Sequence, residues 1–477
     1  MIPAFGGIPR SPALPTGSFA LGTQSSGAEE PEPVKVALSS YRSKPHSGGQ
    51  GVYVRNLSRE LVALGHEVEV FSGPPYPDLD DGVRLTHVPS LDLYHPDHPF
   101  RRPPLREFRT AIDVLEYATM CTAGFPEPRT FSLRLARLLR GRLGEHDVLH
   151  DNQTHGPGLI DLARRGLPVL TTIHHPISAD RRVDLAAAQG LRRLTLRRWY
   201  GFVAMQRRVA RRSRHVVTVS RRAAADITAD FGVPPERMRV IPVGVDVGTF
   251  RPAPPAARVP GRIVTVASAD VPTKGLPVLV AALARCDPAH RPFELVVVGT
   301  PGEHPLAAVR AAGLGDRVRF TSGLADHELA ALLGSAQLLA VPSVYEGFCL
   351  PAVEAMACGT PVVASDVGAL AELVGPDGHL GTDGRCGTLV PPGDAPALSA
   401  ALDALLAAPE RCAALGEAAR RRAVATYSWT AVARATADVY AEIARPRDVG
   451  GVGDQGGDQG DQGGGQGDRD RPERSAA

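Results

Sequence analysis

Two glutamates on either side of a glycine-containing loop are the strongest candidates in this chain for a ligand-binding site. Glu346 and Glu354 lie in the segment VPSVYEGFCLPAVEAMACGTPVV, with seven residues between them. Pro351 suits the first position of a helix, because a proline there has no N–H group to leave unpaired. We therefore expect a helix to begin at Pro351, with Glu354 in its first turn and Glu346 in the loop before it.

Such a loop and helix start can bind an anion. Backbone N–H groups of the loop and the positive end of the helix dipole point to one place, which suits a phosphate. A carboxylate further along could accept hydrogen bonds from the hydroxyls of an attached sugar or ribose. Either glutamate alone has a structural explanation, since an acidic residue in a first turn complements the helix dipole. Together they predict a nucleotide-sugar site.

The pattern S-x-x-E-G-F-x-L-P-x-x-E-A-M-A-x-G-x-P-V-V resembles the donor-site signature of the retaining glycosyltransferases of family 4. The resemblance extends from about residue 34 to residue 444. It implies the GT-B fold, an α/β architecture with two Rossmann-like domains facing a central cleft and a C-terminal helix crossing back to the first domain. It also implies that Glu346 contacts donor sugar hydroxyls and that Glu354 binds the ribose. The other donor-binding residues that it implies here are Gly347, Phe348, Cys349 and Leu350.

A lysine in the second half of the chain resembles another family 4 residue. Lys274 and the glycine after it match the pair that holds the donor diphosphate. The departing nucleoside diphosphate gains negative charge as the glycosidic bond breaks, so a preorganised cation stabilises it. The resemblance implies three catalytic residues, which are His174, Lys274 and Glu346. Family 4 generally has an arginine where this chain has Ala269. Either another arginine substitutes for it, the diphosphate is stabilised less, or the donor differs.

A second glycine-rich segment, GGQG at residues 48–51, follows the first predicted strand. It lacks the G-x-G-x-x-G spacing of a dinucleotide-binding loop, and the next strand ends at Phe71 and Ser72, where a ribose-binding acid would be needed. A dehydrogenase is therefore disfavoured. By resemblance, Gly48 and Gly49 let the backbone approach the donor phosphates. A plain tight turn is the alternative, because glycine pairs mark turns routinely.

Polar residues follow two further predicted strands. Asp151 and Asn152 end one of them, and His174 and His175 end the next. Ligands of open parallel sheets bind at the carboxyl ends of the strands, so these residues are candidates for the acceptor side. The resemblance assigns His174 to the lining of the reaction centre, with His175 in place of a frequent aspartate. The sequence leaves open which histidine points into the site.

Composition favours a globular protein of two or three domains. The 477 residues are 43% hydrophobic and 22% charged, with no run of 18 apolar residues. The first residues lack the basic and apolar regions of a secretory signal, and the six cysteines lack C-x-x-C spacing. We therefore expect a cytoplasmic protein. No D-x-D pair lies in a loop directly at a strand end, although Asp78, Asp80 and Asp81 lie in a Pro-rich loop. We therefore expect neither a metal nor a cofactor, with the nucleotide sugar as co-substrate.

Thirteen arginines and a single acid, Asp184, lie in the segment 181–222. Apolar residues recur there at helical spacings, which predicts at least one helix that is basic on one side. One interpretation is a helix packed on the sheet with a solvated basic face. The other is attachment to the anionic inner face of the cell membrane, where each arginine could contribute about 1 kcal/mol. Nucleic acid is disfavoured, because no base-reading motif accompanies the charge.

The chain divides into six segments. Residues 1–33 form a disordered leader, 34–250 the acceptor-binding Rossmann-like domain, and 251–260 a linker. Residues 261–427 form the nucleotide-sugar-binding Rossmann-like domain, 428–446 the helix that crosses back, and 447–477 a disordered Gly/Asp/Gln tail. Within the first domain, the Pro- and Asp-rich residues from about 72 to 104 are predicted to form a loop.

The resemblance implies a retaining, metal-independent hexosyltransferase. It would move a hexose-type sugar from a UDP- or GDP-type donor to an acceptor hydroxyl, on a lipid or glycan intermediate at a membrane surface. One alternative is another reaction on the same fold, such as that of an epimerase or a phosphorylase, because fold does not fix function. Another is a non-catalytic nucleotide-sugar-binding scaffold. Ala269 favours the scaffold, whereas Lys274, Glu346 and Glu354 disfavour it.

Overall fold

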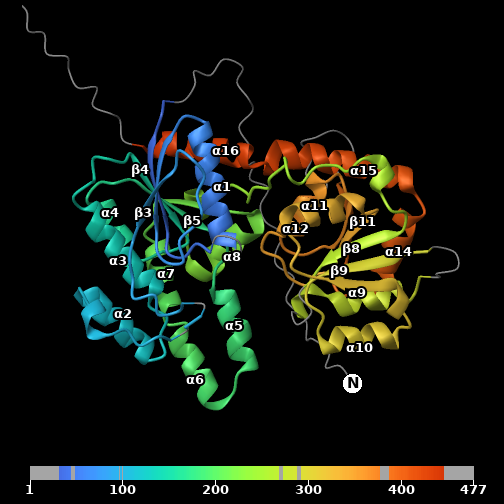
Figure 1. The fold of residues 1–477 in the computed structure, drawn as a ribbon, viewed down its shortest axis with the longest axis horizontal. Coiled ribbons are helices and arrows are strands. Elements are labelled where there is room, and N and C mark those ends of the chain that lie inside the picture. The colour runs from blue at the N-terminus through green and yellow to red at the C-terminus, as the bar shows by residue number, and fades with distance from the viewer. Residues whose placement is uncertain are drawn as a thin grey trace, which may run out of the picture. The chain divides into compact units, whose positions relative to one another are not determined.

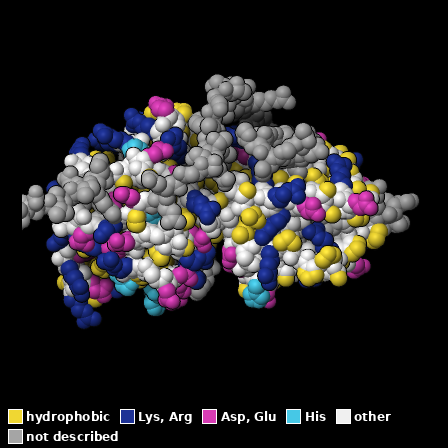
Figure 2. Space-filling model, turned by 90° about the horizontal axis from the view of Figure 1, so that it is seen from above, with side chains coloured by type: hydrophobic (Ala, Val, Ile, Leu, Met, Phe, Trp, Pro, Cys, Tyr) yellow, Lys and Arg dark blue, Asp and Glu magenta, His cyan; other side chains and the backbone are white. Residues whose placement is uncertain are grey.

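The computed structural model describes residues 32–44, 49–95, 97–98, 100–267, 272–286, 292–375 and 386–444. Gly48, Ala269, the predicted tail and nearly all of the predicted leader lie outside these ranges. Two parallel sheets, each covered by helices, make up the framework of the described chain (Figure 1). The face seen in Figure 2 mixes acidic, basic and apolar side chains.

The first sheet has seven strands in the order β3-β2-β1-β4-β5-β6-β7, all parallel. The strand order reverses between β1 and β4, and ligands of open α/β sheets bind beside such a point. The strands are β1 (Lys35–Ser40), β2 (Glu67–Ser72), β3 (Arg84–His87), β4 (Val148–Asn152), β5 (Val169–Ile173), β6 (His215–Thr218) and β7 (Met238–Val240).

The edge strand β3 corrects one prediction. It lies inside the segment from about 72 to 104 that was predicted to be a loop, and it pairs with β2 from Arg84 to His87. Its sequence, RLTH, is short and mostly polar, and none of its residues is fully buried. Pairing with β2, rather than burial of apolar side chains, holds β3 in its extended conformation. The sequence of β3 therefore has no apolar run by which the strand could be predicted.

Eight helices lie between β1 and β7 along the described chain. They are α1 (Gly49–Ala63), α2 (Ala111–Cys121), α3 (Glu127–Leu139), α4 (Pro157–Arg164), α5 (Ser178–Ala187), α6 (Gly190–Trp199), α7 (Phe202–Ala210) and α8 (Arg221–Phe231). The arginine-rich segment therefore forms three helices and the start of a fourth. Of these, α7 is the helix that combines buried apolar residues, Val203 and Val209, with exposed arginines, as the helical spacing predicted.

The second sheet has six parallel strands in the order β10-β9-β8-β11-β12-β13. They are β8 (Arg262–Val266), β9 (Glu294–Val298), β10 (Val318–Thr321), β11 (Leu338–Val341), β12 (Val362–Ser365) and β13 (Gly387–Val390). The order reverses between β8 and β11. The helices are α9 (Leu276–Leu283), α10 (Glu303–Ala311), α11 (Asp326–Ser335), α12 (Leu350–Ala357), α13 (Leu370–Val374), α14 (Ala395–Leu406) and α15 (Pro409–Arg422).

The last described helix, α16 (Trp429–Ile443), packs on the first sheet although it follows the second in sequence. Its residues Val432 and Tyr440 share one apolar cluster with Val36 of β1 and Leu57 of α1. Figure 1 shows α16, in red, beside α1, in blue. A buried hydrogen bond of 2.6 Å joins the Tyr440 hydroxyl to His150 of β4. The C-terminal helix thus crosses back to the first domain.

Candidate functional site

The switch point of the second sheet brings Lys274 and Glu346 together. Lys274 ends a short 3₁₀ turn after β8, and Glu346 lies in the loop after β11. Their Nζ and Oε1 atoms are 2.6 Å apart, and the Ser343 hydroxyl donates to the same carboxylate oxygen at 2.8 Å. Glu346 is buried, whereas about a third of the Lys274 side chain (32%) is exposed. A buried carboxylate therefore holds a cation whose other side is open to a ligand.

Two glycines allow the three loops at this edge to pack closely. Gly275 has φ +67°, and a Cβ there would lie 1.9 Å from the carbonyl oxygen of Pro342. Gly368, in the loop after β12, has φ +55°, and its Cβ would lie 1.9 Å from the carbonyl oxygen of Glu346. Any other residue at either position would displace the loop that carries Glu346. Sequence reasoning identified Gly275 beside Lys274 but missed Gly368, for which no motif was recognised.

The helix after Glu346 begins one residue earlier than predicted. Helix α12 starts at Leu350, so Glu354 lies in its second turn, and the prediction of a first-turn position is wrong. Pro351 is the second helical residue, which also has no N–H partner to lose. Cys349 precedes the helix with φ +59° and turns the chain into it. At Gly347 an added Cβ would meet nothing within 4 Å, so the loop between Glu346 and α12 is open at this point.

Burial raises the pKa of two groups here, the Glu354 carboxyl in α12 and the Cys349 thiol just before the helix, with different consequences. Burial raises the pKa of Glu354 to about 7, with a smaller contribution from Asp326. The Glu354 carboxylate makes no hydrogen bond or ion pair to any part of the chain that the structure describes. It is therefore available to a ligand. Burial also raises the pKa of the Cys349 thiol, which stays protonated and packs as an apolar group.

The ends of β4 and β5 bring Asn152 and His174 together in the first sheet. Nε2 of His174 lies 2.8 Å from Oδ1 of Asn152, and the backbone N–H of His174 donates to the Gln153 side chain at 2.8 Å. The Tyr53 ring meets the imidazole edge to face, with centroids 4.8 Å apart. Burial lowers the pKa of His174 to about 3, and the neighbouring histidines add to this effect. His174 is therefore neutral near pH 7.

The two adjacent histidines differ in their surroundings. His174 is partly buried at the strand ends, whereas His175 is exposed and its Nε2 lies 3.2 Å from Asp180 of α5. The structure thus favours His174 as the histidine of the site. The Nδ2 atom of Asn152 is buried and has no partner among the residues that the structure describes. That amide can donate a hydrogen bond to a ligand.

Asp151 lies beneath these residues and is fully buried. Its carboxylate accepts hydrogen bonds from the Ser39 hydroxyl at 3.2 Å and from the backbone N–H groups of Thr154 and His155 at 3.1 and 3.0 Å. Burial raises its pKa to about 6. These contacts hold a turn in which His155 has φ +48°. Asp151 positions the turn after β4, and sequence reasoning missed that turn because no glycine marks the unusual backbone.

The loop that carries Glu346 and Gly347 also contacts the first domain, through the N-terminus of α8. The Ser220 hydroxyl donates to the carbonyl oxygen of Gly347 at 3.0 Å. The backbone N–H groups of Arg221 and Arg222 donate to the Glu372 carboxylate at 2.9 and 2.8 Å. These bonds satisfy N–H groups that a helix start leaves without partners. Gly49, the other donor-side candidate, is the first residue of α1 and follows β1 at the switch point of the first sheet.

Two further observations concern metals and membranes. Within the described ranges, no group of three or more His, Cys, Asp or Glu side chains is arranged to hold a metal ion. Over the same ranges, every helix is too short or too polar to cross a membrane.

Paired parallel sheets, a cation at the switch point of one and a neutral histidine at the strand ends of the other define a GT-B type of protein. The family model "Glycosyltransferase Family 4" matches residues 47–249, and "Glycosyl transferases group 1" matches residues 252–422. The chain therefore belongs to glycosyltransferase family 4, and it is a glycosyltransferase.

Curated relatives and a solved structure agree with this assignment. The chain is 53% identical over 410 residues to the MMP alpha-(1→4)-mannosyltransferase of Mycolicibacterium hassiacum. The aligned region covers 85% of this chain and 98% of that protein. The chain is 31% identical over 445 residues to D-inositol 3-phosphate glycosyltransferase 2 of Catenulispora acidiphila, with 86% and 95% covered. The structure of a sucrose-phosphate synthase from Thermosynechococcus elongatus is similar, with a TM-score of 0.61, 26% identity, and 86% and 98% covered.

Proposed function

We propose that the enzyme transfers a mannosyl group from a nucleoside diphosphate mannose to the 4-hydroxyl of a sugar acceptor, with retention of the α configuration. The name of the relative at 53% identity supports the sugar and the linkage. The contact between Lys274 and Glu346 is the observation that carries the donor assignment, because it places a held cation beside a carboxylate at the switch point. A lone cation would bind phosphate, and the carboxylate adds a partner for sugar hydroxyls.

In the proposed reaction, the bond between the sugar C1 and the phosphate oxygen breaks while the acceptor oxygen bonds to C1 on the same face. Lys274 and the N-terminal end of α12 stabilise the negative charge that develops on the departing diphosphate, without a metal or another cofactor. The acceptor hydroxyl loses its proton to the departing phosphate. Glu346 orients the sugar and the ammonium of Lys274. Glu354, which has no protein partner, accepts hydrogen bonds from the ribose.

On the acceptor side, neutral His174 and the Nδ2 atom of Asn152 lie next to the acceptor hydroxyl that reacts. Burial keeps His174 from competing for the acceptor's proton, since its pKa is about 3. The imidazole and the amide instead offer directed hydrogen bonds. Such groups favour a hydroxyl acceptor over an apolar one.

Peripheral attachment to an anionic membrane is supported by α6. None of its residues is buried, and Leu191 and Leu194 are 79% and 58% exposed among four arginines. A helix of this kind can lie at a bilayer surface. Co-sedimentation of the protein with vesicles of anionic lipid should then depend on Leu191 and Leu194. If a variant with Leu191→Ser and Leu194→Ser sediments with the vesicles as well as wild type does, attachment through α6 is contradicted.

The donor assignment is tested by thermal stabilisation with UDP-, GDP- and ADP-sugars. A ligand at a hundred times its dissociation constant adds about 2.7 kcal/mol to the free energy of unfolding. We expect stabilisation by one mannose donor, lost in Lys274→Ala and Glu354→Ala. Analysis of the product's anomeric configuration by NMR then tests retention. Stabilisation by no nucleotide sugar would overturn the donor assignment, and binding without transfer to any sugar acceptor would favour the scaffold.

A further inference from the structure

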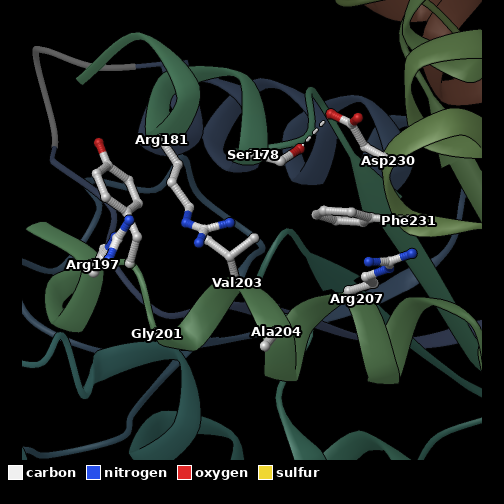
Figure 3. A pocket seen from close by; sticks show the side chains of 10 residues that line it. Ser178, Arg181, Arg197, Gly201, Val203, Ala204, Arg207, Asp230 and Phe231 are labelled. Carbon is white, nitrogen blue, oxygen red and sulfur yellow. Dashed lines mark hydrogen bonds between the residues drawn. The ribbon is translucent and has the colours of Figure 1, made fainter. Parts of the chain in front are cut away.

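A pocket lies among α5, the α6–α7 corner and the C-terminal end of α8, and none of Lys274, Glu346 and Glu354 lines it. It encloses about 240 Å³ (Figure 3). Three arginines line it, Arg181 from α5, Arg197 from α6 and Arg207 from α7. Figure 3 shows the Arg181 guanidinium above Val203, with Arg207 below Phe231 and Arg197 at the opposite end.

The positive charge of this pocket is not neutralised by the protein. None of the three lining arginine side chains makes a hydrogen bond or ion pair with another residue that the structure describes. Asp230 is the carboxylate in the lining, and it is already engaged. It accepts from the Ser178 hydroxyl at 2.5 Å and from Arg182, which is not part of the lining, at 2.8 Å. Three unpaired guanidinium groups around one cavity therefore favour an anion.

The volume and the lining residues of the pocket indicate which class of anion it could bind. A guanidinium group presents its N–H donors in a planar fork that matches the oxygens of phosphate. Phe231 and Val203 are buried and give the pocket an apolar floor. A cavity of 240 Å³ is larger than a bare phosphate needs. These features fit a phosphate ester, with its anionic group on the arginines and its organic part on the apolar floor.

Helix α8 separates this pocket from the proposed donor phosphates. The N-terminal residue Arg221 contacts the second domain, whereas Asp230 and Phe231 at the other end line the pocket. Ten residue steps along a helix correspond to about 15 Å. The pocket is thus a separate place, although α5 connects it to His175, whose imidazole contacts Asp180.

We propose that this pocket binds a phosphate ester outside the donor site. The phosphate ester comes either from a soluble compound, including a phosphorylated acceptor, or from the headgroup of an anionic lipid. The proposal does not depend on the identity of the donor or of the transferred sugar.

The test compares two triple variants that remove the same charge. Arg181→Gln, Arg197→Gln and Arg207→Gln together change the pocket, whereas Arg137→Gln, Arg208→Gln and Arg214→Gln remove three exposed arginines outside its lining and outside α6. The melting midpoint of each protein is measured against glycerol phosphate, with sodium chloride at matched ionic strength as a reference. We expect a saturable rise for wild type and the control variant, and an apparent Kd weakened about tenfold or more in the pocket variant.

Two further arms make the result decisive. Lys274→Ala should keep the response to glycerol phosphate, because that response arises away from the donor site. Vesicles of anionic and neutral lipid distinguish the sources: binding to anionic vesicles that is lost only in the pocket variant identifies a lipid headgroup. The proposal is overturned if both triple variants respond alike, if Lys274→Ala alone abolishes the response, or if wild type responds to neither glycerol phosphate nor anionic vesicles.

Discussion

At the scale of single residues, the contact between Lys274 and Glu346 differs from a surface ion pair. Exposed pairs contribute little because water screens them, as expected for Lys35 and Glu67, whose side chains are 44% and 62% exposed. Glu346 is buried and also bound by the Ser343 hydroxyl, so the Lys274 ammonium is held in one place before a ligand arrives. Preorganised charge of this kind lowers the barrier to leaving-group departure.

Replacement of Lys274 should therefore reduce turnover, and it should also cost stability because the buried Glu346 carboxylate loses its cation. For Lys274→Ala we expect kcat to fall by about 10²–10³-fold, which is typical for the loss of one preorganised group that stabilises transition-state charge. Lys35→Ala is the matched control and should leave kcat unchanged. Steady-state kinetics with circular dichroism of both variants make the comparison. A fall in kcat of the same size in both variants would contradict the assigned role.

The raised pKa of Glu354 predicts how the free energy of unfolding changes with pH. Its pKa is about 7 in the folded protein against 4.5 for the ordinary side chain, because burial disfavours the charged form. The folded state therefore binds a proton that the unfolded state releases, and the free energy of unfolding falls as pH rises from about 4.5 to about 7. Above that range the contribution of Glu354 is constant.

Glu354→Gln should remove this part of the pH dependence, and denaturant titrations at about pH 5 and about pH 8 measure it. A donor whose ribose hydroxyls bind the carboxylate should lower the pKa of Glu354 and weaken the pH dependence in wild type. Identical pH profiles for wild type and Glu354→Gln would contradict the assignment of the raised pKa to this residue.

At the scale of elements, the loops after β8, β11 and β12 meet at the proposed donor side because Gly275 and Gly368 allow their close approach. Gly275→Ala should displace the Pro342 backbone and with it Glu346, lowering kcat and the free energy of unfolding together. Gly393→Ala is a matched control, since Gly393 has φ +74° but a Cβ there would meet nothing within 4 Å. That control should cost only about 1 kcal/mol of backbone strain. Equal losses in both variants would show that packing against Pro342 is unimportant.

Sequence reasoning identified more of the residues that meet at the proposed donor side than of those that meet at the proposed acceptor side, for physical reasons. Lys274 and Glu346 were recognised because their motif is long, and the structure places them in contact. The turn that holds Glu354 was misjudged because the left-handed conformation of Cys349 moves the helix start by one residue. Burial, which separates His174 from His175, comes from elements distant in sequence, Tyr53 among them. No local pattern contains that information.

At the scale of the whole molecule, the last helix of the described chain, α16, packs close to the proposed acceptor side. Trp429 at the start of α16 is buried against Gly244, where an added Cβ would lie 2.3 Å from the indole Cδ2 atom. Its ring meets that of Tyr53 with centroids 5.6 Å apart, and Tyr53 in turn meets His174. A chain of packed rings therefore connects the start of α16 to the proposed reaction centre.

Trp429→Ala should destabilise the protein and weaken acceptor use while sparing donor binding. Removal of a buried tryptophan costs about 3–5 kcal/mol of unfolding free energy, and Tyr53 loses the ring that fixes its place beside His174. Val424→Ala, at a 41% exposed position five residues earlier, should change stability by less than about 0.5 kcal/mol. Denaturant unfolding, donor affinity and the acceptor KM are measured for both variants. If Trp429→Ala weakens donor affinity as much as it raises the acceptor KM, the effect is general unfolding, and the ring contacts do not position His174.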